Sequence, residues 1–295
     1  MTENAGKRAP VADGGTSGSG MAQGPKTSSD LKPRLIAGAV MAAVALILDY
    51  AGPIPFALLV VGVAVVMCWE WGRLVRAEDY GPALVVHALA VVFAGVLAAA
   101  GLPALGLAAL AIGAGVLLAM PFGSRRLMST AGVAYVGLPV IALLWLRDDP
   151  ALGFEAVLFL FAIVWGSDIG AFAAGRGIGG PKLWPRVSPN KTWAGFFGGL
   201  TAGLVAGIIF AHVVPGTSSL VLAVVGLILA LAAQMGDLAE SALKRRFGIK
   251  DSSAIIPGHG GVMDRADSMV AVSIAVSLLA LLVNADSPAR ALFGL

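Results

Sequence analysis

The chain has 295 residues, of which 58% are hydrophobic and only 13% are charged, and its mean hydropathy is +0.89. Soluble domains carry about 25% charged residues, so this composition excludes an ordinary soluble domain and predicts an integral membrane protein. The pI is about 9.2, but the basic residues fall between apolar runs rather than on one soluble face, which favours anionic lipid or phosphate ligands and no nucleic acid.

The first 30 residues are rich in Gly, Ser, Thr, Lys and Asp and lack apolar periodicity, which predicts a disordered cytoplasmic tail at 1–30. After it, apolar runs of near-spanning length recur, so we expect an all-α, polytopic membrane protein of about nine transmembrane helices. The expected spans are 34–50, 54–75, 82–100, 102–120, 130–147, 152–174, 193–213, 219–245 and 264–285. We group them as N-terminal transmembrane helices (31–150) and a C-terminal transmembrane catalytic region (151–295).

The distribution of lysine and arginine orients these helices. With the N-terminus in the cytoplasm, all but two of the twenty Lys and Arg residues fall on the cytoplasmic side, and only Arg147 and Arg290 fall outside. An error of one helix would scatter the basic residues over both sides. The pattern therefore predicts an odd number of spans, an external C-terminus, and a multi-pass protein of the cell inner (plasma) membrane with its polar site facing the cytoplasm.

Cys68 is the single cysteine and lies in an apolar run beside Trp69. A lone cysteine excludes an internal disulfide and a cysteine-based metal site. We interpret Cys68 as a packing residue, and any metal site in this chain must use other ligands.

Three cytoplasmic segments carry most of the polar side chains. They are 165–180, 182–195 and 235–268. Asp168 and Asp237 lie near the ends of apolar helices, where a carboxylate is disfavoured unless it is protonated, paired or bound to a cation. Asp264 and Asp267 open the last helix, where carboxylates also act as ordinary caps, and for Asp267 both interpretations stay open.

The polar side chains suit phosphate ligands. Oxygen ligands without cysteines favour a hard cation such as Mg²⁺, which commonly binds one or two carboxylates together with substrate phosphates. The PGHGG turn at 257–261 offers backbone amides and glycines that permit close approach of a ligand. His259 is a phosphate donor, a base, or a hydrogen-bonding loop residue. In the SPNKT segment, Ser188, Lys191 and Thr192 precede an apolar run, where they bind an anion or only cap the helix.

The segment from 241 to 267 reads SALKRRFGIKDSSAIIPGHGGVMDRAD and holds five basic residues, three acidic residues and a histidine. It resembles the signature of the phosphatidate cytidylyltransferases, also called CDP-diacylglycerol synthases. The resemblance extends to the SPNKT segment and to Asp168, and so covers residues 160–270, whereas the helices before residue 150 match only in character. Ala266 departs from the family, which usually has a larger apolar residue or Thr there, and this bears on local packing.

The resemblance implies transfer of the cytidylyl group of CTP to phosphatidic acid at the membrane lipid surface, giving CDP-diacylglycerol and pyrophosphate. It implies a divalent cation, with one or two Mg²⁺ ions held by Asp237 and Asp264. The expected catalytic residues are Asp237, Asp264, Lys244, Arg265 and Asp267. The expected substrate-binding residues are Asp168, Ser188, Lys191, Thr192, Arg245, Lys250, Asp251, His259, Gly260 and Gly261.

The resemblance also implies a homodimer, although the sequence shows no interface. The glycine-rich segment 193–213 allows close helix packing, either within one chain or between two. The assembly therefore remains open at this point.

Two alternatives remain. The first is a related enzyme that uses CTP with an isoprenoid ether lipid or a polyprenol acceptor. The second is a cation-coupled transporter or channel, with Asp168 and Asp237 as its ion site. A transporter needs access from both sides, whereas the polar residues of this chain gather on one side, so the sequence favours the enzyme.

Overall fold

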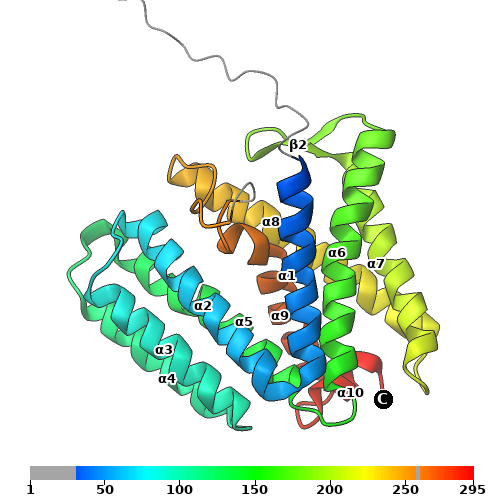
Figure 1. The fold of residues 1–295 in the computed structure, drawn as a ribbon, viewed down its shortest axis with the longest axis horizontal. Helices are drawn as coiled ribbons and strands as arrows, with labels where there is room; N and C mark the ends of the chain where they lie inside the picture. Colours follow the sequence, from blue (N-terminus) through cyan, green and yellow to red (C-terminus); the bar gives the residue numbers. More distant parts are fainter. Residues whose placement is uncertain (1–30, 257–259) are drawn as a thin grey trace, which may run out of the picture.

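The computed structural model describes residues 31–256 and 260–295, and within them nearly all regular structure is helical (Figure 1). The long helices are α1 (Leu31–Ala51), α2 (Pro53–Arg76), α3 (Pro82–Ala99), α4 (Pro103–Ala119), α5 (Arg126–Arg147), α6 (Gly153–Gly177), α7 (Trp193–Val213), α8 (Ser219–Arg246) and α9 (Met263–Val283). The short elements are a 3₁₀ helix (Gly123–Arg125), strands β1 (Lys182–Trp184) and β2 (Ser188–Thr192), and helix α10 (Pro288–Phe293). The predicted tail at 1–30 and His259 lie outside the described residues.

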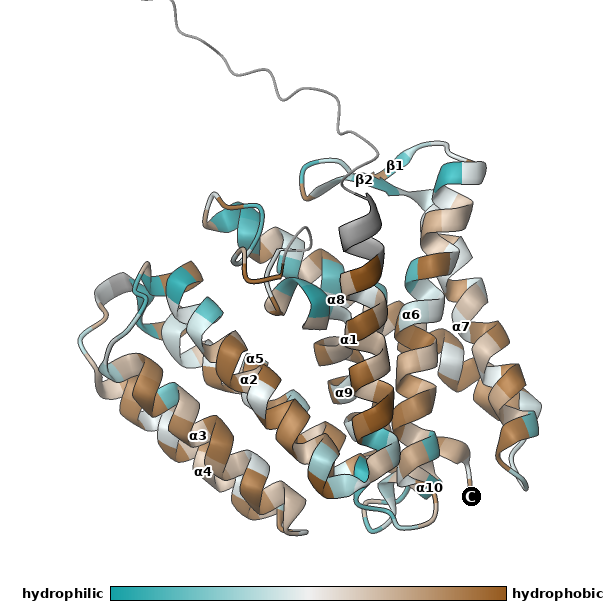
Figure 2. Cartoon of the chain, viewed as in Figure 1, coloured by the Kyte–Doolittle hydropathy of each residue, from teal (hydrophilic) through white to brown (hydrophobic). Residues whose placement is uncertain are grey.

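The helices are apolar along their lengths, and hydrophilic residues gather toward their ends (Figure 2). Among the described residues, seven helices are long and apolar enough to cross a membrane, and two shorter apolar helices, Ile36–Ala51 and Pro103–Ala119, accompany them. The prediction of a polytopic α-helical membrane protein is therefore confirmed. The predicted count of nine spans and the orientation of the termini stay predictions.

Helices α6, α7 and α8 pack closely because glycines line their crossings. A Cβ atom added to Gly198 of α7 would lie 2.7 Å from the carbonyl oxygen of Gly170 in α6. A Cβ atom added to Gly203 would lie 2.7 Å from the carbonyl oxygen of Gly226 in α8. Small residues allow this close backbone approach in membrane helices. The glycine-rich α7 is therefore used for packing within the chain.

A two-stranded antiparallel hairpin, β1 and β2, precedes α7 and is a small addition to the predicted all-α architecture, which the structure confirms. Lys182 pairs with Thr192 and Trp184 pairs with Ser188. Because both strands of a hairpin are edges, the ribbon tolerates Pro189 within β2. The side chain of Thr192 accepts a hydrogen bond from the backbone N–H of Gly195 at 3.1 Å, so the predicted helix cap is confirmed at Thr192.

Helix α9 joins two packed groups of helices. Its buried residues Met263 and Val270 belong to a hydrophobic core built mainly from α2, α3, α4 and α5. Val272 and Val276 of the same helix belong to a second core built from α6, α7, α8 and α10. The amino-terminal end of α9 therefore lies where side chains from both groups can meet.

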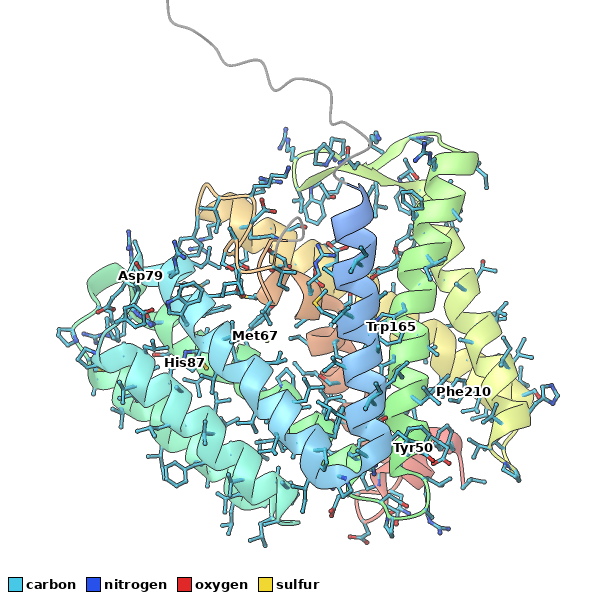
Figure 3. The ribbon with its side chains drawn as sticks, in the orientation of Figure 1. Tyr50, Met67, Asp79, His87, Trp165 and Phe210 are labelled. Atoms are coloured by element: carbon cyan, nitrogen blue, oxygen red, sulfur yellow. The ribbon has the colours of Figure 1, made fainter. Side chains whose placement is uncertain are left out.

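Arg147, one of two basic residues that the charge map places outside, is neutralised by a buried partner. Its Nε donates to Asp49 Oδ1 at 2.6 Å, and its Nη2 donates to the Asp49 carbonyl oxygen at 2.8 Å. Tyr50, next to Asp49, lies at the opposite end of the helices from Asp79, which follows the carboxyl end of α2 (Figure 3). The ion pair therefore joins α1 to α5 at the end opposite the polar cluster described below.

Candidate active site

The last turns of α8 place three ionisable side chains on one face. Asp237, Glu240 and Lys244 follow one another at intervals of three and four residues, which are neighbours on a helix surface. Lys244 Nζ lies 2.6 Å from Asp264 Oδ1 of α9 and 3.4 Å from Glu240 Oε2. Lys244, Glu240 and Asp264 are all largely buried. The ammonium group of Lys244 therefore compensates the charge of its two carboxylate neighbours.

Asp264 binds the segment that precedes α9 as well as Lys244. Its Oδ2 accepts hydrogen bonds from the Ser252 backbone N–H at 2.9 Å, from the Ser252 hydroxyl at 3.1 Å, and from the Gly261 backbone N–H at 2.8 Å. Gly260, at φ 86°, adopts the left-handed backbone that brings the loop back to this carboxylate. Asp264 therefore joins Ser252 and Gly261, two positions of the segment before α9, through one carboxylate oxygen.

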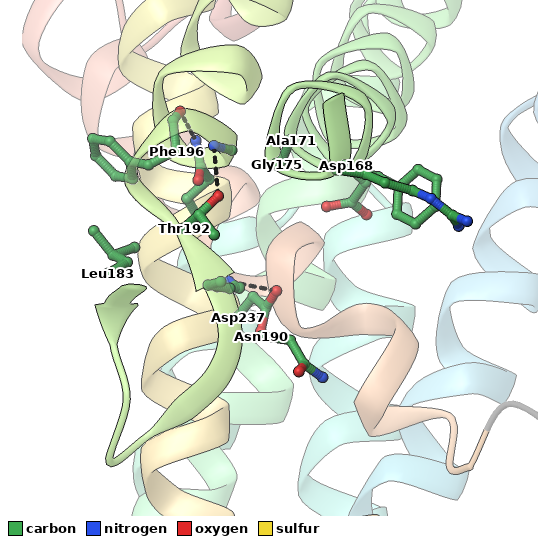
Figure 4. A pocket seen from close by; sticks show the side chains of 13 residues that line it. Asp168, Ala171, Gly175, Leu183, Asn190, Thr192, Phe196 and Asp237 are labelled. Carbon is green, nitrogen blue, oxygen red and sulfur yellow. Dashed lines mark hydrogen bonds and ion pairs between the residues drawn. The ribbon is translucent and has the colours of Figure 1, made fainter. Parts of the chain in front are cut away.

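Asp237 forms the second ion pair of the site. Its Oδ2 lies 2.6 Å from Nζ of Lys191, a residue of β2. Figure 4 labels Asp237 beside the hairpin and marks its interaction with a dashed line. Asp237 Oδ1 accepts a 3.3 Å hydrogen bond from the Ser241 hydroxyl. Both side chains of the pair are partly exposed, at 24% and 32%, so solutes can reach them.

A cavity of about 530 Å³ opens beside this pair, between α6, the hairpin, the start of α7 and the carboxyl-terminal half of α8. Its polar lining comes from Asp168, Arg176, Asn190, Lys191, Thr192, Gln234 and Asp237. Phe172 and Phe196 supply apolar walls. Ligand pockets usually measure about 300 to 1,000 Å³ and combine apolar walls with a few polar groups, so this cavity has the size for a nucleotide or a lipid headgroup.

Further carboxyl groups lie between the two ion pairs. Asp267, one turn along α9 from Asp264, is in contact with Glu240 and lies near Asp237 and Asp168. Glu240 Oε1 is buried and has no hydrogen-bond donor among the described residues. Clustered carboxyl oxygens are ligands that a hard cation such as Mg²⁺ prefers.

The structure places the other predicted residues around this centre. Arg245 donates to the carbonyl oxygens of Val187 and Ile249, and so ties α8 to the hairpin loop. Lys250, Asp251 and Arg265 are exposed at the same end of the molecule. Ser188 pairs in the hairpin, and Gly260 and Gly261 adjoin Asp264, as described above.

Sequence reasoning missed Glu70, Glu240 and Ser252. Glu240 carried a usable signal, because its spacing from Asp237 and Lys244 places it on their helix face. Glu70 is a carboxylate inside an apolar helix, which is itself a mark of function in a membrane protein. Ser252 carried no signal beyond its place in the polar segment.

The carboxylates have the chemistry of a divalent-cation site. Among the described residues, no three His, Cys, Asp or Glu side chains are grouped to hold an ion by themselves. Mg²⁺ is usually bound by one or two carboxylates together with waters and substrate phosphates. Asp237 Oδ1 accepts one long hydrogen bond, and Asp264 Oδ1 contacts only the Lys244 ammonium within the part of the chain that the structure describes. These two oxygens therefore fit an ion that binds together with a nucleotide.

The helices are long and apolar enough to span a membrane, and a nucleotide-sized cavity lies at their ends beside lysine and carboxylate side chains. These features define a membrane protein with a site for phosphate ligands. The cytidylyltransferase family matches residues 32–283 of this chain. A phosphatidate cytidylyltransferase of Brucella suis is 37% identical over 274 residues, covering 90% of this chain and 99% of the relative. A phosphatidate cytidylyltransferase of Brucella abortus is 38% identical over 253 residues, covering 83% of this chain and 91% of the relative.

A third relative, a phosphatidate cytidylyltransferase of Staphylococcus saprophyticus, is 43% identical over 148 residues, covering 50% of this chain and 56% of the relative. The family match covers most of the chain, and the first two relatives align with it over most of their own length. The chain belongs to the cytidylyltransferase family. The resemblance seen in the sequence is therefore confirmed.

Proposed function

We propose that this chain transfers the cytidylyl group of CTP to phosphatidic acid, giving CDP-diacylglycerol and pyrophosphate for phospholipid biosynthesis. The observation that carries the proposal is the ion pair of Lys191 with Asp237 in the wall of the cavity, with a second pair, Lys244 with Asp264, two helical turns further along α8. Relatives that align over most of the chain are named for this activity. A site at the helix ends serves a water-soluble nucleotide and a lipid headgroup together.

The reaction needs an in-line displacement at phosphorus. A phosphate oxygen of phosphatidic acid attacks the α-phosphorus of CTP, a new P–O bond forms, and the bond to the bridging oxygen of the β-phosphate breaks, so that pyrophosphate leaves. Little covalent chemistry falls to the protein, and its task is to position the reactants and stabilise charge. Lys191 and Lys244 would exchange their carboxylate partners for phosphate oxygens, with Arg265 and Lys250 as further phosphate ligands.

We propose Mg²⁺ as the cofactor, with Asp237 and Asp264 as its protein ligands. When bound, the ion would neutralise phosphate charge and polarise the reacting phosphoryl group. Asp267 and Glu240 lie behind these ligands and add carboxyl oxygens to the site. Asp168 and Thr192 would complete the pocket from α6 and the start of α7, where both line the cavity.

We further propose nine spans, with the N-terminus and the active site in the cytoplasm and the C-terminus outside the inner (plasma) membrane. The charge distribution supports this orientation. Arg147, one of its two exceptions, forms a buried ion pair with Asp49. CTP is a cytosolic nucleotide, which agrees with a cytoplasmic site. A homodimer is proposed on the family resemblance alone.

The proposal is tested with purified protein in lipid–detergent micelles, CTP and Mg²⁺, by following CDP-diacylglycerol formation. We expect turnover with phosphatidic acid that is lost with EDTA and restored by added Mg²⁺. Asp264→Asn should lower kcat by about 100-fold or more, because it removes a charge from the site, whereas Asp286→Asn, the same change at an exposed position outside the site, should not.

An acceptor series separates the alternatives. Phosphatidic acid, an isoprenoid ether phospholipid and a polyprenyl phosphate are supplied to the same preparation. Preference for an isoprenoid acceptor would change the lipid substrate, and folded wild-type protein without cytidylyl transfer to any acceptor would refute the proposed function.

A further inference from the structure

Glu70 of α2 contacts the catalytic segment although it is far from it in the sequence. Its Oε1 accepts hydrogen bonds from the Ser253 hydroxyl at 2.5 Å and from the Val262 backbone N–H at 2.9 Å, and its Oε2 accepts one from the Met263 backbone N–H at 2.6 Å. The residue is completely buried. A buried carboxylate is costly unless such donors satisfy it, so these contacts explain how Glu70 is tolerated.

The two backbone donors belong to the start of α9. The first N–H groups of a helix have no partner within the helix, and α9 has no cap from a side chain of its own first residues. Glu70 supplies the missing acceptor from a different helix. A carboxylate at this position also interacts favourably with the positive end of the helix dipole.

The contacts of Glu70 continue directly into the site. Met263, whose N–H binds Glu70, immediately precedes Asp264, and the Gly261 N–H donates to Asp264 Oδ2. A Cβ atom added to Gly261 would overlap both the Glu70 carboxylate and the Ser252 hydroxyl. Glu70, Gly261 and Asp264 therefore form one contiguous packed unit.

Neighbouring contacts hold Glu70 itself in place. The next residue, Trp71, donates from Nε1 to the Met128 carbonyl oxygen at 3.0 Å and packs on the ring of Tyr135, with ring centroids 5.0 Å apart. Both partners belong to α5. The backbone that carries Glu70 is thus packed against α5, in the N-terminal half of the chain.

We propose that Glu70 is a positioning residue, which holds the first turn of α9 so that Asp264 faces Lys244 and the reacting phosphates. The proposal rests on the proposed function. It assigns the N-terminal helices α2 and α5 a part in catalysis, although neither lines the cavity. Since a misplacement of about 1 Å in a catalytic group can lower the rate about 100-fold, loss of this contact should appear mainly in kcat.

The test compares Glu70→Gln with wild type and with the control variant Glu78→Gln. Glu78 lies just after the end of α2, is partly exposed and forms an ion pair with Arg76. Glutamine offers one acceptor oxygen, and its amide nitrogen cannot accept from a backbone N–H. We expect Glu70→Gln to lower kcat by about 100-fold and to change the KM for CTP by less than about threefold, after normalisation to CTP-binding stoichiometry. Glu78→Gln should match wild type.

Amide hydrogen exchange at residues 260–264 supplies a readout that does not depend on activity. Glu70→Gln should speed exchange there by about tenfold or more, the equivalent of one lost hydrogen bond, while exchange in α7 stays unchanged. Ser253→Ala keeps both bonds to the helix start and should lower kcat only slightly. The Glu70→Gln/Ser253→Ala double variant should resemble Glu70→Gln, because both changes act on one unit.

If Glu70→Gln does not fold, Glu70→Asp replaces it, since the shorter carboxylate keeps the charge but cannot reach both N–H groups. Unchanged kcat and unchanged exchange in the folded variant would overturn the proposal. A KM increase without loss of kcat would also overturn it. Wild-type protein without turnover would instead refute the proposed function, and the exchange result would still report whether Glu70 holds the helix start.

Discussion

Replacing Lys244 by methionine should destabilise the protein strongly, because it removes the cation from a buried cluster of carboxylates. The Lys244 side chain is only 12% exposed, and its partners Asp264 and Glu240 are 4% and 0% exposed. Removing one partner of a buried ion pair costs about 3 to 5 kcal/mol, since the remaining charge has no compensation. At about 3 kcal/mol, the unfolding equilibrium shifts by roughly 100-fold.

The expected destabilisation is measured by denaturant or thermal unfolding in detergent, followed by tryptophan fluorescence. Lys250→Met serves as the control, because it makes the same chemical change at an exposed position. Adding Asp264→Asn to Lys244→Met should recover part of the lost stability, since it removes one of the uncompensated charges, and it should not recover turnover. The reasoning is refuted if Lys244→Met is as stable as Lys250→Met, or if the double variant is less stable than both single variants.

Two further substitutions test the cavity and the helix packing. Lys191→Met should raise the KM for CTP by about tenfold in steady-state kinetics, because it removes one charge-assisted contact to a phosphate. An unchanged KM would argue against binding of the CTP phosphates beside Asp237. Gly203→Val should destabilise the folded protein by about 1 to 3 kcal/mol in the same unfolding assay, because its side chain would overlap Ala230 and the Gly226 carbonyl. Gly62→Val, where no atom lies within 4 Å of an added Cβ, is the matched control, and equal losses in the two variants would contradict the close crossing of α7 and α8.

Hydropathy and glycine and proline positions predicted most of the helical architecture from the sequence. The turn at Gly101, for example, separates α3 from α4 with a backbone φ of 76°, and Pro103 begins the following helix. These signals are local, so a single sequence contains them. The hairpin was missed because strands of three and five residues are too short to show a period.

The candidate site was predicted in its members but not in its contacts. Asp264 and Lys244 stood out because charges are costly in an apolar chain, yet nothing in the sequence indicates that they pair with each other. The same limit hid Glu70, whose partners lie 183 and more positions away along the chain. Such contacts depend on how the helices pack, and helix packing is set by tertiary shape rather than by local pattern.

The fate of the CTP phosphates tests the central claim most directly. Wild-type protein is incubated with phosphatidic acid and CTP labelled in either the α- or the γ-phosphate, and the organic and aqueous phases are separated. Cytidylyl transfer predicts that the α-label enters a lipid that co-migrates with CDP-diacylglycerol, in proportion to the pyrophosphate released, while the γ-label stays in the aqueous phase. An α-label that remains entirely aqueous with folded protein, or a γ-label that enters the lipid, would contradict the assignment.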